Sequence, residues 1–308
     1  MKAPFLPAFI LTALVLTLPA CCRRYSFRFF GSLTRWEVNM MDRSQRGSLA
    51  ILIVLNMTAF AVAAGTQLTI TKDPQAVAVA QTALTAMGGV QALLSYQDSQ
   101  AAGTVTVYGG STPVSYPITL KCKGTQETRV EVQKPSGTSV RIVNQGQGVI
   151  ERPDGTVIHL LMNNTLAERV NHIPLLSILG ESQNGNIQLL YQGVTQVNGQ
   201  NTDSIAVSLV PTTDPVQGPI YASMTQSLFF IDQTTGLVDK IQFTNYAEND
   251  PTNTQKVEIY FGNYQTVNGM SVPLMQTINV NGVLDSTIVL TAISFNVGLP
   301  DSDFTLPQ

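Results

Sequence analysis

Apolar and polar positions alternate with a period of two along much of this chain. The clearest example is residues 227–243, where Ile241 and Phe243 alternate with Lys240 and Gln242. A short polar link from Asp232 to Gly236 separates this run from the apolar residues before it. Period two is typical of a half-buried strand, and an Asp…Gly link suits a tight turn. The stretch therefore predicts a β-hairpin with one face toward a core.

The same pattern recurs in many other segments. We expect strands at residues 104–108, 117–123, 128–132, 139–143, 149–151, 156–161, 187–194, 204–209, 257–261 and 286–295. Asn-Gly pairs at 198–199, 268–269 and 281–282 are strong hairpin signals. Residues 286–295 are nearly continuously apolar, which predicts a central strand. The pattern as a whole predicts a large antiparallel meander of about ten or more strands, and a sheet of that size curls.

Helical spacing appears in two places only. Residues 73–94 begin with Asp73 as N-cap and Pro74 at the first helical position, and the first helix ends at Gly88-Gly89. Its apolar stripe contains Val77, Ala80, Leu84 and Met87, widened by Val79 and Ala83. Residues 163–180 lose period two and predict one or two short helices with an apolar plug at residues 175–179. We expect these helices on the concave side of the sheet, and a loop at residues 211–219.

The N-terminal region differs from the rest. A charged segment from Met40, the apolar run 49–64 and the small residues before Ala64 form the three parts of a secretory signal. We therefore predict a spurious extension at residues 1–39, a signal peptide at 40–64 cleaved near Ala63-Ala64, and a single domain at 65–308. Two alternatives remain open: lipidation at Cys21, or a membrane anchor formed by the apolar runs at 5–20 and 49–64.

Charge supports this division and excludes one class of partner. Residues 1–64 hold 7 Lys and Arg against 2 Asp and Glu, whereas residues 65–308 hold 10 against 18, a formal charge of −8. An acidic chain with scattered cations is unsuited to nucleic acid, because phosphate binding needs clustered Lys and Arg.

Motifs for catalysis or metal binding are absent from the sequence. There is no G-x-S-x-G elbow, phosphate loop, dinucleotide fingerprint or HExxH. His159 and His172 are the only histidines, too few and too far apart for a zinc site. Cys122 shares the parity of Ile118 and Leu120, which predicts a buried, inert thiol. We expect no cofactor and no metal.

The order of elements resembles a known family. The resemblance is carried by the sequence AMGG at 86–89, by GTV at 103–105, and by three C-terminal runs at 230–241, 264–273 and 303–307. These resemble bacterial proteins related to the periplasmic lipoprotein carrier, the LolA-like group, over residues 73–307. The resemblance implies a mainly β (α+β) fold, a half-open incomplete β-barrel closed by helices over an apolar cavity that holds acyl chains. Where the carrier has a basic residue, Pro and then Phe, this chain has Lys123, then Gly124 and no Phe.

The function we expect is non-enzymatic binding or carriage of a hydrophobic ligand, such as a lipid or a lipoprotein acyl chain, in the periplasm or outside the cell. Contact with membrane-associated envelope proteins would load or unload it. The alternatives are a secreted hydrolase with an unrecognised carboxylate site, and a structural or sensor protein of the envelope. Lys123 and Arg129 have the parity of the solvent face, where they are either solvated or at the rim of a cavity. The candidate cavity-lining residues are Val77, Leu84, Leu175, Leu176, Leu179, Phe243 and Phe261.

Overall fold

A computed structural model describes residues 70–167, 179–180, 182, 185–210, 216–247, 250 and 252–307. Backbone contacts divide the chain into Met1–Ala64 and Gly65–Gln308, and all described residues belong to the second unit. The predictions for residues 1–39 and 40–64 lie outside the described residues, as do Leu175 and Leu176. Within the described ranges, no helix is long and apolar enough to cross a membrane.

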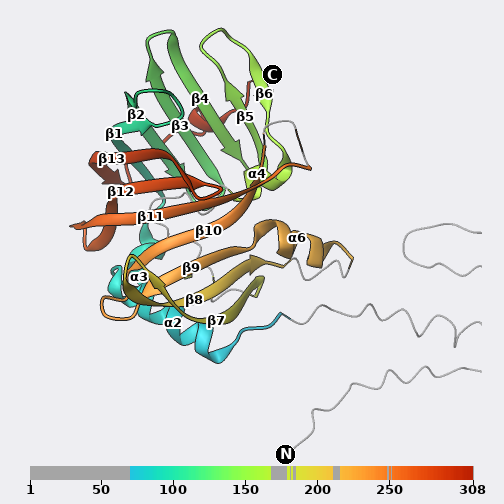
Figure 1. Ribbon diagram of the computed structural model, residues 1–308, viewed down its shortest axis with the longest axis vertical. Coiled ribbons are helices and arrows are strands. Elements are labelled where there is room, and N and C mark those ends of the chain that lie inside the picture. Colours follow the sequence, from blue (N-terminus) through green and yellow to red (C-terminus); the bar gives the residue numbers. More distant parts are fainter. Residues whose placement is uncertain are drawn as a thin grey trace, which may run out of the picture. The chain divides into compact units, whose positions relative to one another are not determined.

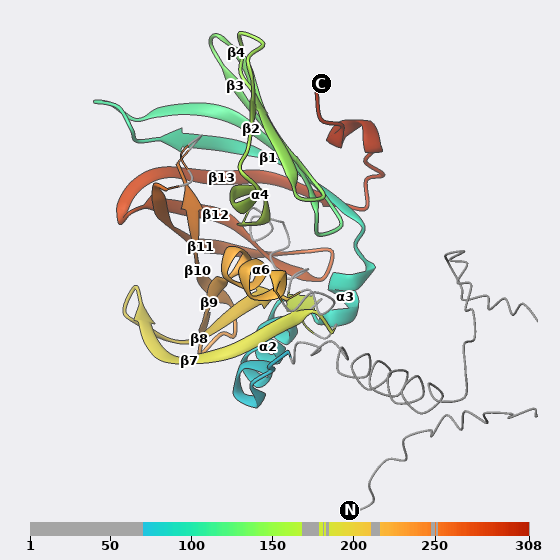
Figure 2. The same cartoon turned by 90° about the vertical axis from the view of Figure 1, so that its right-hand side faces the viewer.

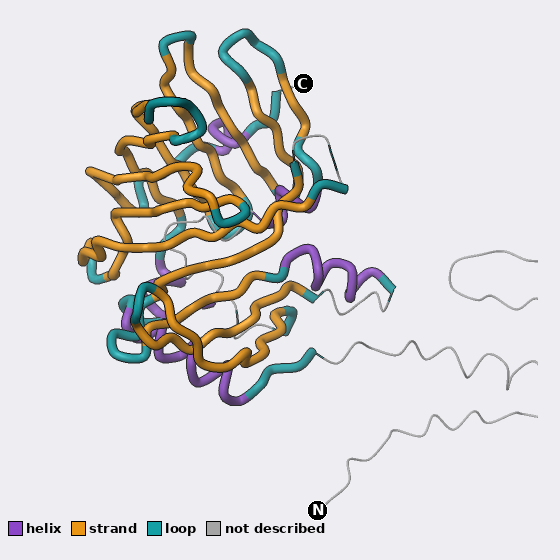
Figure 3. Tube along the Cα trace, in the orientation of Figure 1, coloured by secondary structure: helices purple, strands orange, loops and turns teal. Residues whose placement is uncertain are grey.

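Strands dominate this part of the chain (Figure 3). They are β1 Asp98–Val107, β2 Val114–Lys123, β3 Glu127–Lys134, β4 Gly137–Asn144, β5 Gln147–Glu151, β6 Val157–His159, β7 Ile187–Val197, β8 Gln200–Leu209, β9 Ser227–Asp232, β10 Val238–Tyr246, β11 Thr254–Val267, β12 Met270–Val280 and β13 Val283–Phe295. The helices are α2 Pro74–Ala86, α3 Val90–Ser95, α4 Met162–Ala167 and α6 Gln217–Thr225, with a 3-10 turn, η3, at Asp301–Phe304.

All thirteen strands form one antiparallel sheet in the order β6-β5-β4-β3-β2-β1-β13-β12-β11-β10-β9-β8-β7. The order differs from that of a single meander: β1–β6 and β7–β13 are two meanders that meet where β1 pairs with β13 (Figure 1). The predicted central position of residues 286–295 is confirmed, since β13 is the middle strand. In Figure 2 the sheet curves from β4 at the top, through β13 and β12, to β7 at the bottom. The expected mainly β, open and curled antiparallel sheet is confirmed.

The local sequence signals explain the connections. Asn198, Asn268 and Asn281 have φ near +50° and each is followed by a Gly with φ near +80°, which is the type I′ geometry that two-residue hairpins favour. Between β9 and β10, the Asp232 carboxylate accepts hydrogen bonds from the amides of Thr234 (2.9 Å) and Thr235 (2.6 Å). These predicted hairpins are therefore confirmed.

The predicted helix start is also confirmed. The Asp73 carboxylate accepts a bond of 2.8 Å from the Gln75 amide, and Pro74 opens α2. The helix ends before Gly88, whose φ is +120°. The buried side of α2 carries Ala76, Ala80, Ala83 and Leu84.

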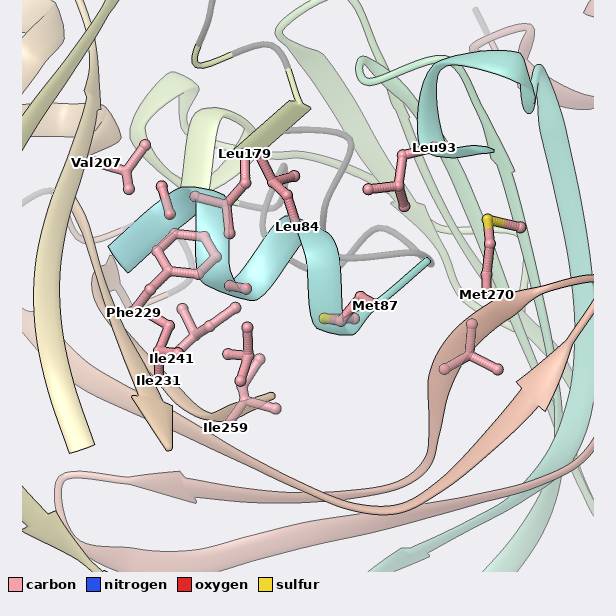
Figure 4. Close-up of a cluster of buried hydrophobic side chains, with 14 of the residues drawn as sticks. Leu84, Met87, Leu93, Leu179, Val207, Phe229, Ile231, Ile241, Ile259 and Met270 are labelled. Atoms are coloured by element: carbon pink, nitrogen blue, oxygen red, sulfur yellow. The ribbon is translucent and has the colours of Figure 1, made fainter. Parts of the chain in front are cut away.

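The main core lies between α2 and one face of the sheet, which we call the inner face. Leu84, Met87 and Leu179 meet side chains of β8 to β12 there (Figure 4). Phe229, Ile241 and Ile259 occupy paired positions on β9, β10 and β11, so that their side chains share this face. All three are at most 2% exposed. The same face continues through paired residues across β12, β13 and β1 to β2 and β3.

The opposite, outer face of β2–β5 is covered by the C-terminal segment. Phe304 of η3 is fully buried, and Leu306 packs on a small cluster of Val140, Ile142 and Val149. The Asn144 side chain donates a hydrogen bond of 3.1 Å to the Phe304 carbonyl. The C-terminal segment thus fixes the outer side of this meander.

One loop prediction is wrong. Residues 211–219 were expected to be irregular, but α6 begins at Gln217. Pro219 lies in the first helical turn, where the backbone N–H has no intrahelical acceptor, so proline costs little there. The helical prediction for residues 163–180 is confirmed in its described part by α4.

Candidate functional site

Half-buried apolar side chains gather on the inner face at the β1–β3 end of the core. The set, which we call the inner-face patch, packs on the core without being fully enclosed and consists of Tyr116 and Leu120 on β2 and Val130 and Val132 on β3. Strand register builds it, because Leu120 pairs with Val130, Ile118 with Val132, and Val105 with Tyr116. Directly paired residues of neighbouring strands point to the same face, so β2 and β3 present a continuous apolar surface.

Helix α2 covers a different part of the inner face. It packs on β7 and β8, and the Ser271 amide at the start of β12 donates a hydrogen bond of 3.1 Å to the Met87 carbonyl. At the β9–β10 turn, Gly236 lies so close to α2 that a Cβ there would be 3.0 Å from the Cβ of Ala86. The helix therefore fills the side of the sheet away from the inner-face patch.

The predicted lining residues take different positions. Leu84, Leu179 and Phe243 are buried in the core, and Phe261 is half-buried against it. Val77 is 42% exposed, because Ala76 occupies the buried stripe of α2 instead. Four of the seven candidates, Leu84, Leu179, Phe243 and Phe261, therefore pack in or against the closed core and do not line an open surface.

Lys123 and Arg129 lie on the outer face. The Lys123 ammonium pairs with Asp301, and Arg129 donates a hydrogen bond of 3.1 Å to the Asp303 carbonyl. The neighbouring Lys121 forms a 3.0 Å salt bridge with Asp303. These cations hold η3 against β2 and β3, and hydrogen bonding to Lys123 keeps the pKa of Asp301 below its ordinary value.

The inner-face patch was not among the predicted lining residues. The alternation of residues 117–123 and 128–132 does predict that Leu120, Val130 and Val132 point inward. It cannot say which inward residues a helix covers, because that depends on where α2 packs. The signal that would have found the patch is inward parity combined with distance along the sheet from the helix.

The three fully buried carboxylates of the described chain have structural roles. Asp98 accepts hydrogen bonds from the amides of residues 297–299 at 2.7–3.0 Å. Asp232 caps the β9–β10 turn, and Glu258 pairs with Lys240 and Lys256 on the outer face, each at 3.2 Å. They do not converge on one site, as the hydrolase alternative would require.

Among the described residues, the carboxyl group of Asp239 has a raised pKa. Burial, together with the nearby charge of Asp232, raises the pKa of Asp239 to about 6. Asp239 lies at an irregularity between β9 and β10, beside the turn that Asp232 caps. Asp239 lies on β10, and four strands separate it from β2 of the inner-face patch.

The described residues do not form a metal site or a site built on histidine. His159 is exposed at the end of β6, and His172 lies outside the described ranges. No cluster of three or more metal-ligating side chains occurs among the described residues. Cys122 is buried, as predicted.

Comparison with known proteins gives a likeness of fold. No family model matches the chain, and no curated protein matches it. Among solved structures, a DUF1329 family protein from Desulfovibrio piger has a TM-score of 0.50 at 12% identity, covering 76% of this chain and 98% of that one. A putative outer membrane lipoprotein-sorting protein domain from Vibrio parahaemolyticus has a TM-score of 0.46 at 13% identity, covering 74% and 95%. A LolA superfamily protein from Nitrosomonas europaea has a TM-score of 0.47 at 13% identity, covering 74% and 97%.

At these identities the likeness is one of architecture only. The chain has an open, curled antiparallel sheet, and the likeness to these solved structures is one of fold alone.

Proposed function

We propose that this protein binds and carries a hydrophobic ligand, a lipid or an acyl chain, against the inner face of β1–β3. The observation that supports the proposal is the inner-face patch, a set of apolar side chains that continues the core but stays half-buried. Apolar surface of this kind is stabilised by covering it, and a flexible chain can follow a curved sheet without polar contacts.

Burial of a hydrocarbon chain can supply the whole free energy of binding, so this mode of binding needs no recognition motif. Each CH₂ group removed from water contributes about 0.8 kcal/mol, so a chain of about fifteen buried carbons contributes about 12 kcal/mol. After an association cost of about 4 kcal/mol, about −8 kcal/mol remains, which corresponds to an affinity in the micromolar range. This explains why the sequence contains no catalytic or cofactor signature.

The proposal also covers where the protein works and how it exchanges its ligand. Secretion after cleavage near Ala63-Ala64 would place the protein in the periplasm or outside the cell. There it would work without catalysis, receiving or delivering its ligand through transient contact with membrane-associated envelope proteins. The acidic charge of residues 65–308 fits a protein that does not bind anionic membrane surfaces through general attraction.

A titration with a fluorescent 16-carbon fatty-acid analogue tests the proposal. We expect saturable binding by the purified protein and a loss of at least about tenfold in affinity for Val130→Asp, because a carboxylate would then have to be covered by the chain. The matched control is Glu131→Gln, on the outer face of the same strand, which should bind as the parent does. Absence of saturable binding, or equal affinity in Val130→Asp with an unchanged circular dichroism spectrum, would overturn the proposal.

A further inference from the structure

A glutamine lies on the inner face at the border between the closed core and the inner-face patch. Gln276 of β12 pairs with Phe261 of β11 and with Ile288 of β13. Ile288 belongs to the core and Phe261 packs on it, and directly paired residues share a face. Gln276 therefore points to the inner side of the sheet. It is only 6% exposed, although glutamine is mostly exposed in folded proteins.

The surroundings of Gln276 offer its side-chain amide no partner. Its four neighbours on the inner face are all apolar, namely Leu274 and Ile278 on the same strand and Phe261 and Ile288 on the adjacent strands. Among the described residues, the Gln276 side chain has no hydrogen bond. A buried amide without a partner destabilises the folded state, so Gln276 lowers the stability of the fold relative to an apolar residue of the same size.

The row of paired residues that contains Gln276 leads to the inner-face patch. Beyond Ile288 it continues with Val105 of β1 and Tyr116 of β2, and Tyr116 belongs to the patch. Ile288 and Val105 are 8% and 7% exposed, so this row is less closed than the core at β9–β11. Neighbouring strands are about 4.8 Å apart, which places Gln276 and Tyr116 about 14 Å apart along the sheet. A hydrocarbon chain on the patch therefore reaches Gln276 by crossing β1 and β13.

The chemistry of the carboxamide decides which ligand group fits beside it. Its NH₂ group donates hydrogen bonds and its oxygen accepts them. The carbonyl oxygen of an acyl ester or acyl amide can accept from the NH₂ group, and the N–H of an acyl amide can also donate to the Gln276 oxygen. A carboxylate fits less well, because among four apolar neighbours its charge would lose its hydration without gaining a charged partner.

We propose that Gln276 binds the carbonyl group that joins the acyl chain of a neutral lipid to its head group, while the hydrocarbon lies on the inner-face patch. This inference rests on the proposed function and narrows its ligand class to acyl esters and acyl amides. Burial of the chain supplies the affinity, and the hydrogen bond at Gln276 fixes where along the inner face the chain begins. The ligand in turn provides the partner that the fold does not give to this amide.

Displacement of the fluorescent fatty-acid analogue by two neutral lipids tests the inference. 1-Oleoylglycerol and 1-O-oleylglycerol share the glycerol group and the chain, and only the first, an ester, has a carbonyl group. We expect the parent protein to bind the ester about fivefold more tightly than the ether, the factor for one neutral hydrogen bond. In Gln276→Met, which keeps the side-chain length without the amide, the two should bind equally. Gln265→Met, the same exchange at an exposed position of β11, should keep the preference.

Thermal melts of the ligand-free proteins give a second readout. Gln276→Met removes a buried amide that has no partner, so we expect its melting temperature to rise by about 2–4 °C. Gln265→Met should melt as the parent does. A glutamine that serves the fold alone would give the opposite result, a lower melting temperature on substitution. Gln276→Leu also removes the amide and repeats both measurements if the methionine variant does not fold.

The linkage and the failures are separated by the remaining arms. N-oleoylethanolamine against 1-oleoylglycerol distinguishes an amide from an ester, and tighter binding of either supports the inference and identifies the linkage. Equal binding of ester and ether by the parent, a preference that persists without the amide of Gln276, or a lower melting temperature in both Gln276 variants would overturn the inference. The proposed function would then still stand, because the fluorescent analogue binds. Absence of saturable binding of the analogue itself would overturn both.

Discussion

At the scale of single residues, Gly103 shows how closely the two meanders approach each other. It lies on β1 at the register shift opposite Leu290 of β13. A Cβ at this position would meet the carbonyl oxygen of Val289 and lie 2.8 Å from the Cα of Leu290. Both are backbone atoms, which cannot move without separating the two strands.

We therefore predict that Gly103→Ala lowers the free energy of unfolding by at least about 2 kcal/mol, through overpacking against the backbone. Urea denaturation followed by circular dichroism measures the change. Gly262→Ala is the matched control, because a Cβ on that strand glycine meets no atom within 4 Å. Equal effects of the two substitutions would show that the β1–β13 seam tolerates a side chain.

The raised pKa of Asp239 predicts how the stability of the fold depends on pH. Its pKa, raised from 3.8 to about 6, means that the folded state binds a proton more tightly than the unfolded state does. The protonated carboxyl group is favoured in the fold, so its contribution is fully present below about pH 4 and is lost as the pH rises through 6. Asp239→Asn should then stabilise the protein at pH 7 and leave it unaffected near pH 4.

Thermal melts of the parent and Asp239→Asn between pH 4 and 7 measure this difference. The other carboxylates, including Asp232 and Glu258, are common to both proteins, so the difference between the two curves isolates Asp239. A difference in melting temperature that stays constant over this range would contradict the raised pKa.

At the scale of elements, α4 links the two meanders at the open side of the sheet. Asn164 donates a hydrogen bond of 2.8 Å to the Tyr246 carbonyl at the end of β10 and accepts one of 2.9 Å from the Tyr246 amide. The hydroxyl of Thr165 donates to the Gly146 carbonyl in the β4–β5 turn at 2.7 Å. One short helix thus joins β4–β5 to β10, which are far apart in the strand order (Figure 2).

Asn164→Ala should cost about 1–3 kcal/mol, because it leaves the N–H and C=O of the half-buried Tyr246 without their partner. It should also raise hydrogen exchange at the amide of Tyr246, while the amides of the β1–β13 seam stay protected. Asn163→Ala, the half-buried neighbour in the same helix, is the control. Unchanged exchange at Tyr246 in Asn164→Ala would show that α4 does not hold the two meanders together.

The sequence predicted elements whose signals are local. Asn-Gly pairs, the Asp232 to Gly236 turn and the Asp73-Pro74 helix start each act within a few residues, and each is found in the structure. The pairing of β1 with β13 joins residues nearly 200 positions apart, and no local pattern specifies it. The start of α6 was missed for a different reason, because its Gly-Pro pair is also typical of loops.

In the candidate site, too, the local pattern was predictable from the sequence and the long-range packing was not. Helical spacing identified Leu84, the apolar plug included Leu179, and strand alternation identified Phe243, but all three are buried in the core. Lys123 and Arg129 have outer-face parity, as the alternation indicated, and the C-terminal segment that covers them could not be anticipated from charge alone. Which apolar surface remains half-buried depends on how distant segments pack, so the inner-face patch appears only in the structure.

At the scale of the whole described unit, one continuous face serves two purposes. Beside β7–β10 it is closed by α2 and forms the core. Beside β1–β3 it stays half-buried and, in the proposed function, is covered by a ligand. The outer face of the same strands is held by the C-terminal segment, so the ligand-binding side can be altered by substitution while the outer side preserves the fold.

Photo-cross-linking with a fatty acid that carries a diazirine on its chain tests the central claim most directly. After irradiation and proteolysis, mass spectrometry locates the labelled residues. The account predicts labels on inner-face residues of β2 and β3, such as Leu120 and Val130, which excess unlabelled palmitoleic acid removes. Labels spread over outer-face positions such as Thr119 and Glu131, or labels that the unlabelled acid does not displace, would contradict it.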